Sequence, residues 1–119
     1  MKIILIEDDV KTVESIKLCL EVYKPCIKLT SMDRGLEALD LLKTEKFDMA
    51  IVDLGLPDID GMNVIEQLRT FSDIPVVVLS ARHTQEVINQ ALKLGAKEYI
   101  TKPFKSAMVI ETIQRFLSR

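Results

Sequence analysis

The stretch that decides the fold is MAIVDLGLPDIDG, residues 49–61. Its first four residues are apolar and predict a strand buried on both faces, and the Gly, Pro and Asp residues after them predict a loop. Asp53 therefore lies at the carboxyl end of a buried strand, where open α/β sheets carry their functional groups. A carboxylate is costly to bury there without a compensating partner, so another part of the chain must supply one. Asp58 and Asp60 are better explained as turn or helix-capping acids.

Length and composition predict one compact domain, residues 1–119. The formal net charge of −2 and the absence of a Lys/Arg block argue against nucleic-acid binding by this domain. No stretch approaches the length of a membrane span, and the amino terminus lacks the pattern of a secretory leader, so we expect a cytoplasmic protein without membrane contact. We expect Cys19 and Cys26 to be buried, reduced thiols, and His83 to be a solvated loop residue.

Hydrophobic periodicity predicts five strands alternating with five helices. Three strands are continuous apolar runs, as in a parallel sheet covered on both faces, and two are mixed, as at its edges. We therefore expect an α/β fold: a flavodoxin-like, doubly wound, five-stranded parallel sheet of order 2-1-3-4-5 with helices on both faces. The expected strands are 2–6, 27–30, 49–52, 76–79 and 98–101, and the expected helical segments are 10–23, 34–44, 61–71, 84–95 and 110–117.

Acidic residues follow two strands that this order makes neighbours. Glu7 and Asp8 come after strand 2–6, and Asp53 comes after strand 49–52, so the three carboxylates are expected to converge at the switch point of the sheet. A hard divalent ion would relieve their repulsion, and Mg²⁺ suits a few carboxylates, a carbonyl and retained waters. Asp9 stays open between this site and the cap of helix 10–23.

Ser80 and Lys102 end two further strands at the same edge of the sheet. A carboxylate nucleophile, a metal ion, a lysine and a hydroxyl are together the parts of a phosphoryl-transfer site. The alternative for Lys102 is a structural ion pair with Asp53.

In this arrangement the chain resembles the receiver domains of two-component response regulators. Five motifs carry the resemblance, in order along the chain: Glu7-Asp8, then Asp53-Leu54-Gly55-Leu56-Pro57 with Asp60-Gly61, then Ser80-Ala81, Tyr99, and Lys102-Pro103-Phe104. They span nearly its whole length.

The resemblance implies a signalling switch that accepts a phosphoryl group from a sensor histidine kinase, not an enzyme acting on a separate substrate. It makes Asp53 the phosphoacceptor, and Glu7, Asp8, Asp53 and the Gly55 carbonyl the Mg²⁺ ligands. It further makes Ser80 with Ala81, Tyr99 and Lys102 the phosphate-contacting and switch residues, and it makes the peptide bond before Pro103 cis.

The motif residues are most similar to receivers of winged-helix transcription regulators. Those receivers dimerise through the face of their fourth helix, fifth strand and fifth helix, here residues 84–95, 98–101 and 110–117. Lys97 stands where they usually carry an acid, and the last helix lacks their usual charge pattern. A homodimer through this face therefore stays an open alternative.

Two other functions compete with this interpretation. A phosphohydrolase of the haloacid-dehalogenase type would also use Asp53 as nucleophile, but it requires a second Asp where this chain has Gly55. A flavin-binding module would need a Ser/Thr/Gly-rich phosphate loop after the first strand, where this chain has acids.

Overall fold

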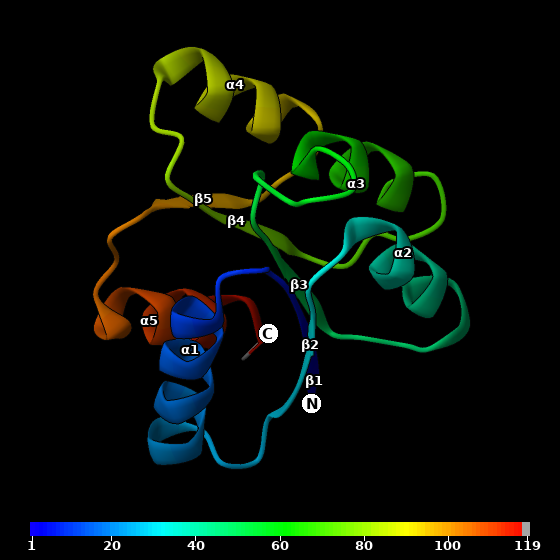
Figure 1. The fold of residues 1–119 in the computed structure, drawn as a ribbon. Helices are drawn as coiled ribbons and strands as arrows, with labels where there is room; N and C mark the ends of the chain where they lie inside the picture. Colours follow the sequence, from blue (N-terminus) through cyan, green and yellow to red (C-terminus); the bar gives the residue numbers. More distant parts are fainter. Residues whose placement is uncertain (118–119) are drawn as a thin grey trace.

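The computed structural model describes residues 1–117, in which strands and helices alternate along the chain (Figure 1). The strands form one parallel sheet of order β2-β1-β3-β4-β5, which confirms the flavodoxin-like fold. The elements are β1 (Lys2–Ile6), α1 (Val10–Tyr23), β2 (Lys28–Met32), α2 (Gly35–Thr44), β3 (Met49–Val52), α3 (Gly61–Leu68), β4 (Val76–Ser80), α4 (Gln85–Lys93), β5 (Glu98–Thr101) and α5 (Ser106–Leu117).

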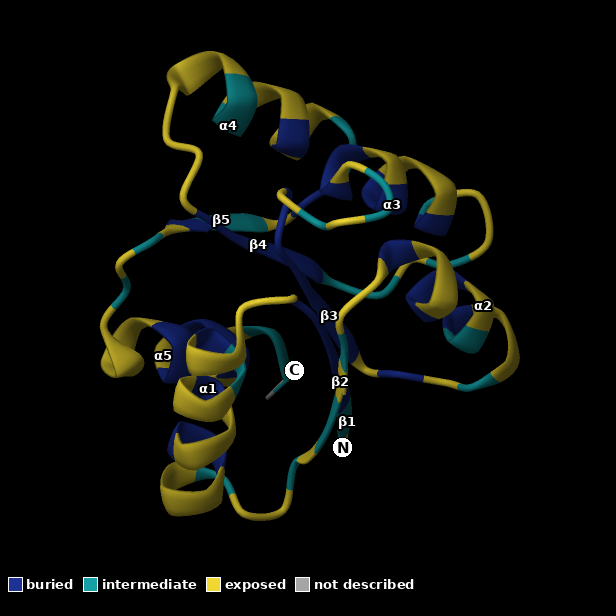
Figure 2. Cartoon of the chain, viewed as in Figure 1, coloured by how far each residue is buried: buried dark blue, intermediate teal, exposed yellow. Residues whose placement is uncertain are grey.

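Each central strand contributes to two cores because successive side chains point to opposite faces of the sheet. In β1, Ile3 and Leu5 pack with α1 and α5, whereas Ile4 and Ile6 pack with α2, α3 and α4. Figure 1 shows these two helix groups on either side of the sheet, and Figure 2 shows the central strands buried between them. Each fully buried Ile or Leu contributes about 1.5–3 kcal/mol, so this double coverage is the main source of stability.

Several boundary and burial predictions from the sequence were wrong. Helix α5 begins at Ser106, ahead of the expected 110, and β4 extends to Ser80. The second strand was expected at 27–30 but lies at Lys28–Met32, because pairing of Met32 with Ile6 extends it. Helix α3 ends at Leu68, and Phe71 lies in the following turn with 38% of its surface exposed. Cys26 is exposed, since it lies in the α1–β2 turn and not in a core; Cys19 is buried, and both thiols are free.

Close approach of the chain to itself fixes the segment after Asp53. The Gly61 amide donates to the Leu54 carbonyl at 2.9 Å, and a Cβ atom on Gly61 would lie 2.4 Å from the Asp53 carbonyl oxygen. Only glycine fits there. Asp60 then caps α3, its carboxylate accepting from the Met62 amide at 2.9 Å, as its sequence position suggested.

Within residues 1–117, no helix combines the length and apolar character needed to cross a bilayer.

Candidate functional site

Three carboxylates meet where β1 and β3 end. Ile6 pairs with Val52 in the sheet, and the Asp53 amide donates to the Ile6 carbonyl at 2.9 Å, so the residues that follow both strands lie together. Glu7, Asp8 and Asp53 each offer a carboxylate oxygen, and these oxygens lie within 4.8 Å of one another. Glu7 and Asp53 are buried, whereas Asp8 is exposed. The group therefore combines one solvent-exposed carboxylate, Asp8, with two buried ones, Glu7 and Asp53.

Lys102 neutralises part of this negative charge. Its Nζ forms an ion pair with Glu7 Oε1 and lies 3.6 Å from Asp53 Oδ2. The sequence predicted this lysine at the same edge of the sheet as Asp53, with an ion pair to Asp53 as the structural alternative. In the structure its main partner is Glu7, and only 18% of its side chain is exposed. The Lys102 amide donates to the Ser80 carbonyl at 2.8 Å, and the Lys102–Pro103 peptide bond is cis, the geometry that the resemblance implies.

The pKa values of Glu7 and Lys102 are both raised, for different reasons. Burial raises the pKa of Glu7 from 4.5 to about 7; the Asp53 carboxyl acts in the same direction, and Lys102 opposes both. Burial alone would lower the pKa of Lys102, but the hydrogen bond to Glu7 and the charge of Asp53 outweigh it, so this pKa is raised. The site therefore favours a cation, and a second positive charge would complete its neutralisation.

The donor set fits a hard divalent ion. Carboxylate oxygens from Glu7, Asp8 and Asp53 are the ligands that Mg²⁺ prefers. Gly55 lies beside them, with its amide 3.4 Å from Asp53 Oδ1. Asp9, by contrast, occupies the N-cap position of α1, and its carboxylate accepts from the Thr12 hydroxyl at 2.7 Å, a bond that lowers its pKa.

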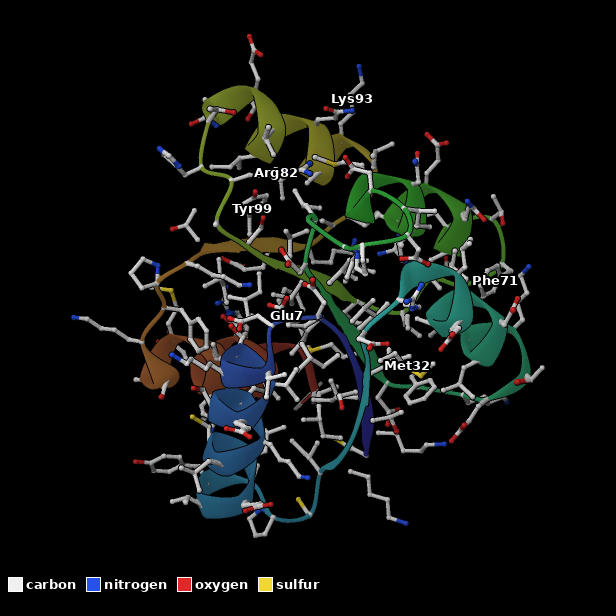
Figure 3. All side chains as sticks on the ribbon, viewed as in Figure 1. Glu7, Met32, Phe71, Arg82, Lys93 and Tyr99 are labelled. Carbon is white, nitrogen blue, oxygen red and sulfur yellow. The ribbon has the colours of Figure 1, made fainter. Side chains whose placement is uncertain are left out.

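Ser80 and Tyr99 lie on the β4 and β5 side of the site. The Ser80 hydroxyl is buried at the end of β4, and its Oγ accepts from the Arg82 amide at 3.2 Å. Tyr99 is half-buried, and its hydroxyl donates to the Arg82 carbonyl at 2.6 Å; burial raises its pKa. Ala81, between these partners, is exposed. Figure 3 shows Tyr99 and Arg82 close together near α4, and Glu7 on the opposite face of the sheet, near α1.

The sequence did not predict the partner of Arg82 at this edge, and it predicted Asp58 as a turn or capping acid without identifying the helix that it caps. The Arg82 guanidinium pairs with Asp60, its Nη1 lying 3.1 Å from Oδ2. The Asp58 carboxylate accepts from the amides of Gly35 and Leu36 at 2.9 and 2.8 Å, and so caps α2 from a distant loop. No local pattern marks either contact. The pattern Asp-Gly before an apolar helical stripe did signal the start of α3, but not the close approach of Gly61 to Asp53.

Comparisons with known proteins agree with this geometry. A family model described as the response regulator receiver domain matches residues 3–114. The transcriptional regulatory protein KdpE of Staphylococcus aureus is 40% identical over 105 residues, which cover 87% of this chain and 44% of KdpE. The transcriptional regulatory protein CusR of Escherichia coli is 32% identical, with 100% of this chain and 52% of CusR covered. The chain thus spans about half the length of these relatives.

Solved structures of receiver domains are also similar to this chain. The receiver domain of the Francisella response regulator 1452 has a TM-score of 0.91 and 32% identity, covering 99% of this chain and 97% of that chain. The receiver domain of the sensor histidine kinase PA1611 of Pseudomonas aeruginosa, solved with a magnesium ion in its active site cleft, has a TM-score of 0.87 and 25% identity over 99% and 98% of the two chains. The alternating fold, the acids that meet where β1 and β3 end, and the match over residues 3–114 have one meaning: this chain belongs to the receiver domain family of two-component response regulators.

Proposed function

We propose that residues 1–119 form one receiver domain in which Asp53 is the phosphoacceptor. The observation that carries this proposal is the meeting of Glu7, Asp8 and Asp53, with the Lys102 ammonium 3.6 Å from the Asp53 carboxylate. Glu7 is just as close to the other two acids and to Lys102, so Asp53 is singled out by its motif, Asp53-Leu54-Gly55-Leu56-Pro57, which resembles the phosphoacceptor motif of the receiver family. The domain is a signalling switch, and it assists its own phosphorylation and dephosphorylation.

The proposed reaction transfers a phosphoryl group from a phosphohistidine or a small acyl phosphate. One carboxylate oxygen of Asp53 attacks the phosphorus, the bond from phosphorus to the donor nitrogen or oxygen breaks, and the leaving group departs with that bond's electron pair. Lys102 moves from Glu7 toward the new phosphoryl oxygens and offsets their charge. Hydrolysis of the acyl phosphate later restores the carboxylate.

Glu7, Asp8, Asp53 and the Gly55 carbonyl are the proposed ligands of Mg²⁺. A bound ion supplies charge neutralisation for the equatorial phosphoryl oxygens. Ser80 donates a hydrogen bond to one of those oxygens, with Ala81 beside it, and Tyr99 follows the movement of the β4–α4 loop. The shared contact of Ser80 and Tyr99 with Arg82 supports this coupling.

The proposed phosphodonor is a sensor histidine kinase, as in other two-component systems. The names of KdpE and CusR support control of transcription by an output domain or partner, and a homodimer through the face of α4, β5 and α5 is one way to transmit the signal. Free Cys19 and Cys26 support a reducing, cytoplasmic setting. The net charge of −2 supports a domain without direct nucleic-acid or membrane binding.

The intact mass of the protein after treatment with acetyl phosphate and Mg²⁺ tests the assignment. Wild type should gain the mass of one phosphoryl group, and the gain should disappear with EDTA or in Asp53→Asn. Asp40→Asn, an exposed Asp on α2, is the matched control and should label normally. Labelling of Asp53→Asn to the wild-type extent contradicts the proposal. Turnover of small phosphoesters would instead favour the dehalogenase-type hydrolase, which the Gly at position 55 disfavours.

A further inference from the structure

The backbone of Arg82 joins the two proposed switch side chains. Its amide donates to Ser80 Oγ at 3.2 Å, and its carbonyl accepts from the Tyr99 hydroxyl at 2.6 Å. Ser80 comes from the end of β4 and Tyr99 from the edge strand β5, so one residue of the β4–α4 loop holds both. The position of the Arg82 backbone therefore decides whether the Tyr99 hydroxyl can keep its hydrogen bond to the Arg82 carbonyl.

The side chain of Arg82 fastens this residue to α3. Its Nη1 lies 3.1 and 3.4 Å from the two carboxylate oxygens of Asp60, which also caps α3 through the Met62 amide. The next residue, Gly61, packs directly on the Asp53 carbonyl, so Asp60 is held at a fixed distance from the phosphoacceptor. Arg82 is therefore anchored to a rigid point of the site.

Little else in the described part of the chain anchors this loop. Residues 81–84 are all exposed, and α4 buries only Ala91 (Figure 2). The remaining side-chain hydrogen bonds of the loop are local, from the Val87 amide to Thr84 and between His83 and the Ala81 carbonyl. A segment with few apolar anchors has low local stability, so a single ion pair can change its position appreciably.

We propose that Arg82 is a positioning residue of the switch, whose ion pair with Asp60 keeps the Arg82 peptide in the place where it binds Ser80 and Tyr99 before phosphorylation. The inference rests on the proposed function and names a device that regulates the same site. Ser80 Oγ can accept from the Arg82 amide while its hydrogen donates to a phosphoryl oxygen, so the ion pair and the phosphoryl group act on one peptide. An exposed ion pair changes such an equilibrium by about two- to fivefold.

Carbon-13 NMR of the full chain labelled at tyrosine Cζ can observe this effect directly. The chain has two tyrosines, and exposed Tyr23 on α1 serves as the internal reference for Tyr99. Arg82→Gln and Asp60→Asn should both move the Tyr99 resonance toward its solvent-exposed position, and Arg82→Lys should largely restore it. Asn remains a good N-cap, so Asp60→Asn removes the ion pair and keeps the cap of α3. Raising NaCl to about 1 M should move wild type in the same direction, because salt screens exposed ion pairs.

The matched control is Arg115→Gln. This substitution breaks the ion pair between Arg115 and Glu98, whose atoms lie 3.2 Å apart. Glu98 directly precedes Tyr99 in the sequence, but the loss of this pair should not move the Tyr99 resonance. The proposal is overturned if Tyr99 stays at its wild-type position in both Arg82→Gln and Asp60→Asn, or if it moves in only one of them. These spectra come from unphosphorylated protein, so failure of Asp53 to accept a phosphoryl group would overturn the proposed function without altering them.

Discussion

Lys102 is a cation that the acidic site already contains. Because its Nζ pairs with Glu7 and lies 3.6 Å from Asp53, a divalent ion must compete with it for those carboxylates. We expect Lys102→Met to bind Mg²⁺ about fivefold more tightly, since one unit charge at about 4 Å contributes about 1 kcal/mol even in water. Isothermal titration calorimetry measures the affinity. Exposed Lys105→Met is the control for long-range charge, and an equal gain in both variants would argue against direct competition.

Glu7 should make the stability of the metal-free protein depend on pH. Burial raises the pKa of Glu7 from its ordinary 4.5 to about 7 in the folded chain, so between these values the folded state binds the additional proton. Stability should therefore fall as pH rises through this window. Urea midpoints in EDTA at about pH 5 and about pH 8 should differ less in Glu7→Gln than in wild type. Parallel pH dependences in the two proteins would show that another group is responsible.

At the scale of elements, Asp58 connects the loop after Asp53 to helix α2. The α2 N-cap residue, Arg34, makes no side-chain cap, and the amides of Gly35 and Leu36 are satisfied by the Asp58 carboxylate. Despite the opposing effect of burial, these hydrogen bonds lower the pKa of Asp58. Its stabilising contribution is therefore present at neutral pH and is lost as the pH falls through the lowered value.

Asp58→Ala should lower the free energy of unfolding by about 0.5–2 kcal/mol, the cost of losing a helix cap. Urea denaturation gives this value, and Asp58→Asn should keep much of the stability because Asn also caps. Exposed Asp40→Ala lies within the same helix and should not destabilise it. Equal stability of Asp58→Ala and wild type would mean that water replaces the carboxylate at the α2 terminus without cost.

At the scale of the whole molecule, the proposed function requires the site to act on the surface formed by α4, β5 and α5. Helix α4 buries only Ala91, whereas β4 is fully buried, so a change at the end of β4 can move α4 without disturbing the core. Ser80→Ala should leave Asp53 able to bind beryllofluoride but weaken the chemical-shift changes in α4 and β5. Backbone amide NMR measures both, with exposed Ser15→Ala on α1 as the control. Full-sized shifts around Tyr99 in Ser80→Ala would exclude Ser80 as the link.

Local pattern was sufficient for the parts of this protein that depend on which side chains are buried. The apolar run Met49–Val52 identified β3, and the mixed character of residues 98–101 identified an edge strand, because coverage by helices decides composition. Strand order then predicted that Glu7 and Asp8 would approach Asp53, since parallel neighbours end at one edge of a sheet. The end of β2 was missed because an exposed edge strand is delimited by pairing with β1 and not by its own composition.

Only the tertiary structure decided which charged groups pair at that edge. Lys102 pairs with Glu7, 95 residues away in the sequence, and Arg82 pairs with Asp60, 22 residues away. The sequence offered other acidic residues as partners for each of these cations. Burial selects Glu7 for Lys102, because a carboxylate removed from water gains most from a neighbouring ammonium. The cap that holds Asp60 at the start of α3 presents it to Arg82. These pairings depend on distances of a few ångströms between loops, which are set by the register of the sheet and the packing of the helices. Hydrophobic periodicity along the chain does not encode these distances.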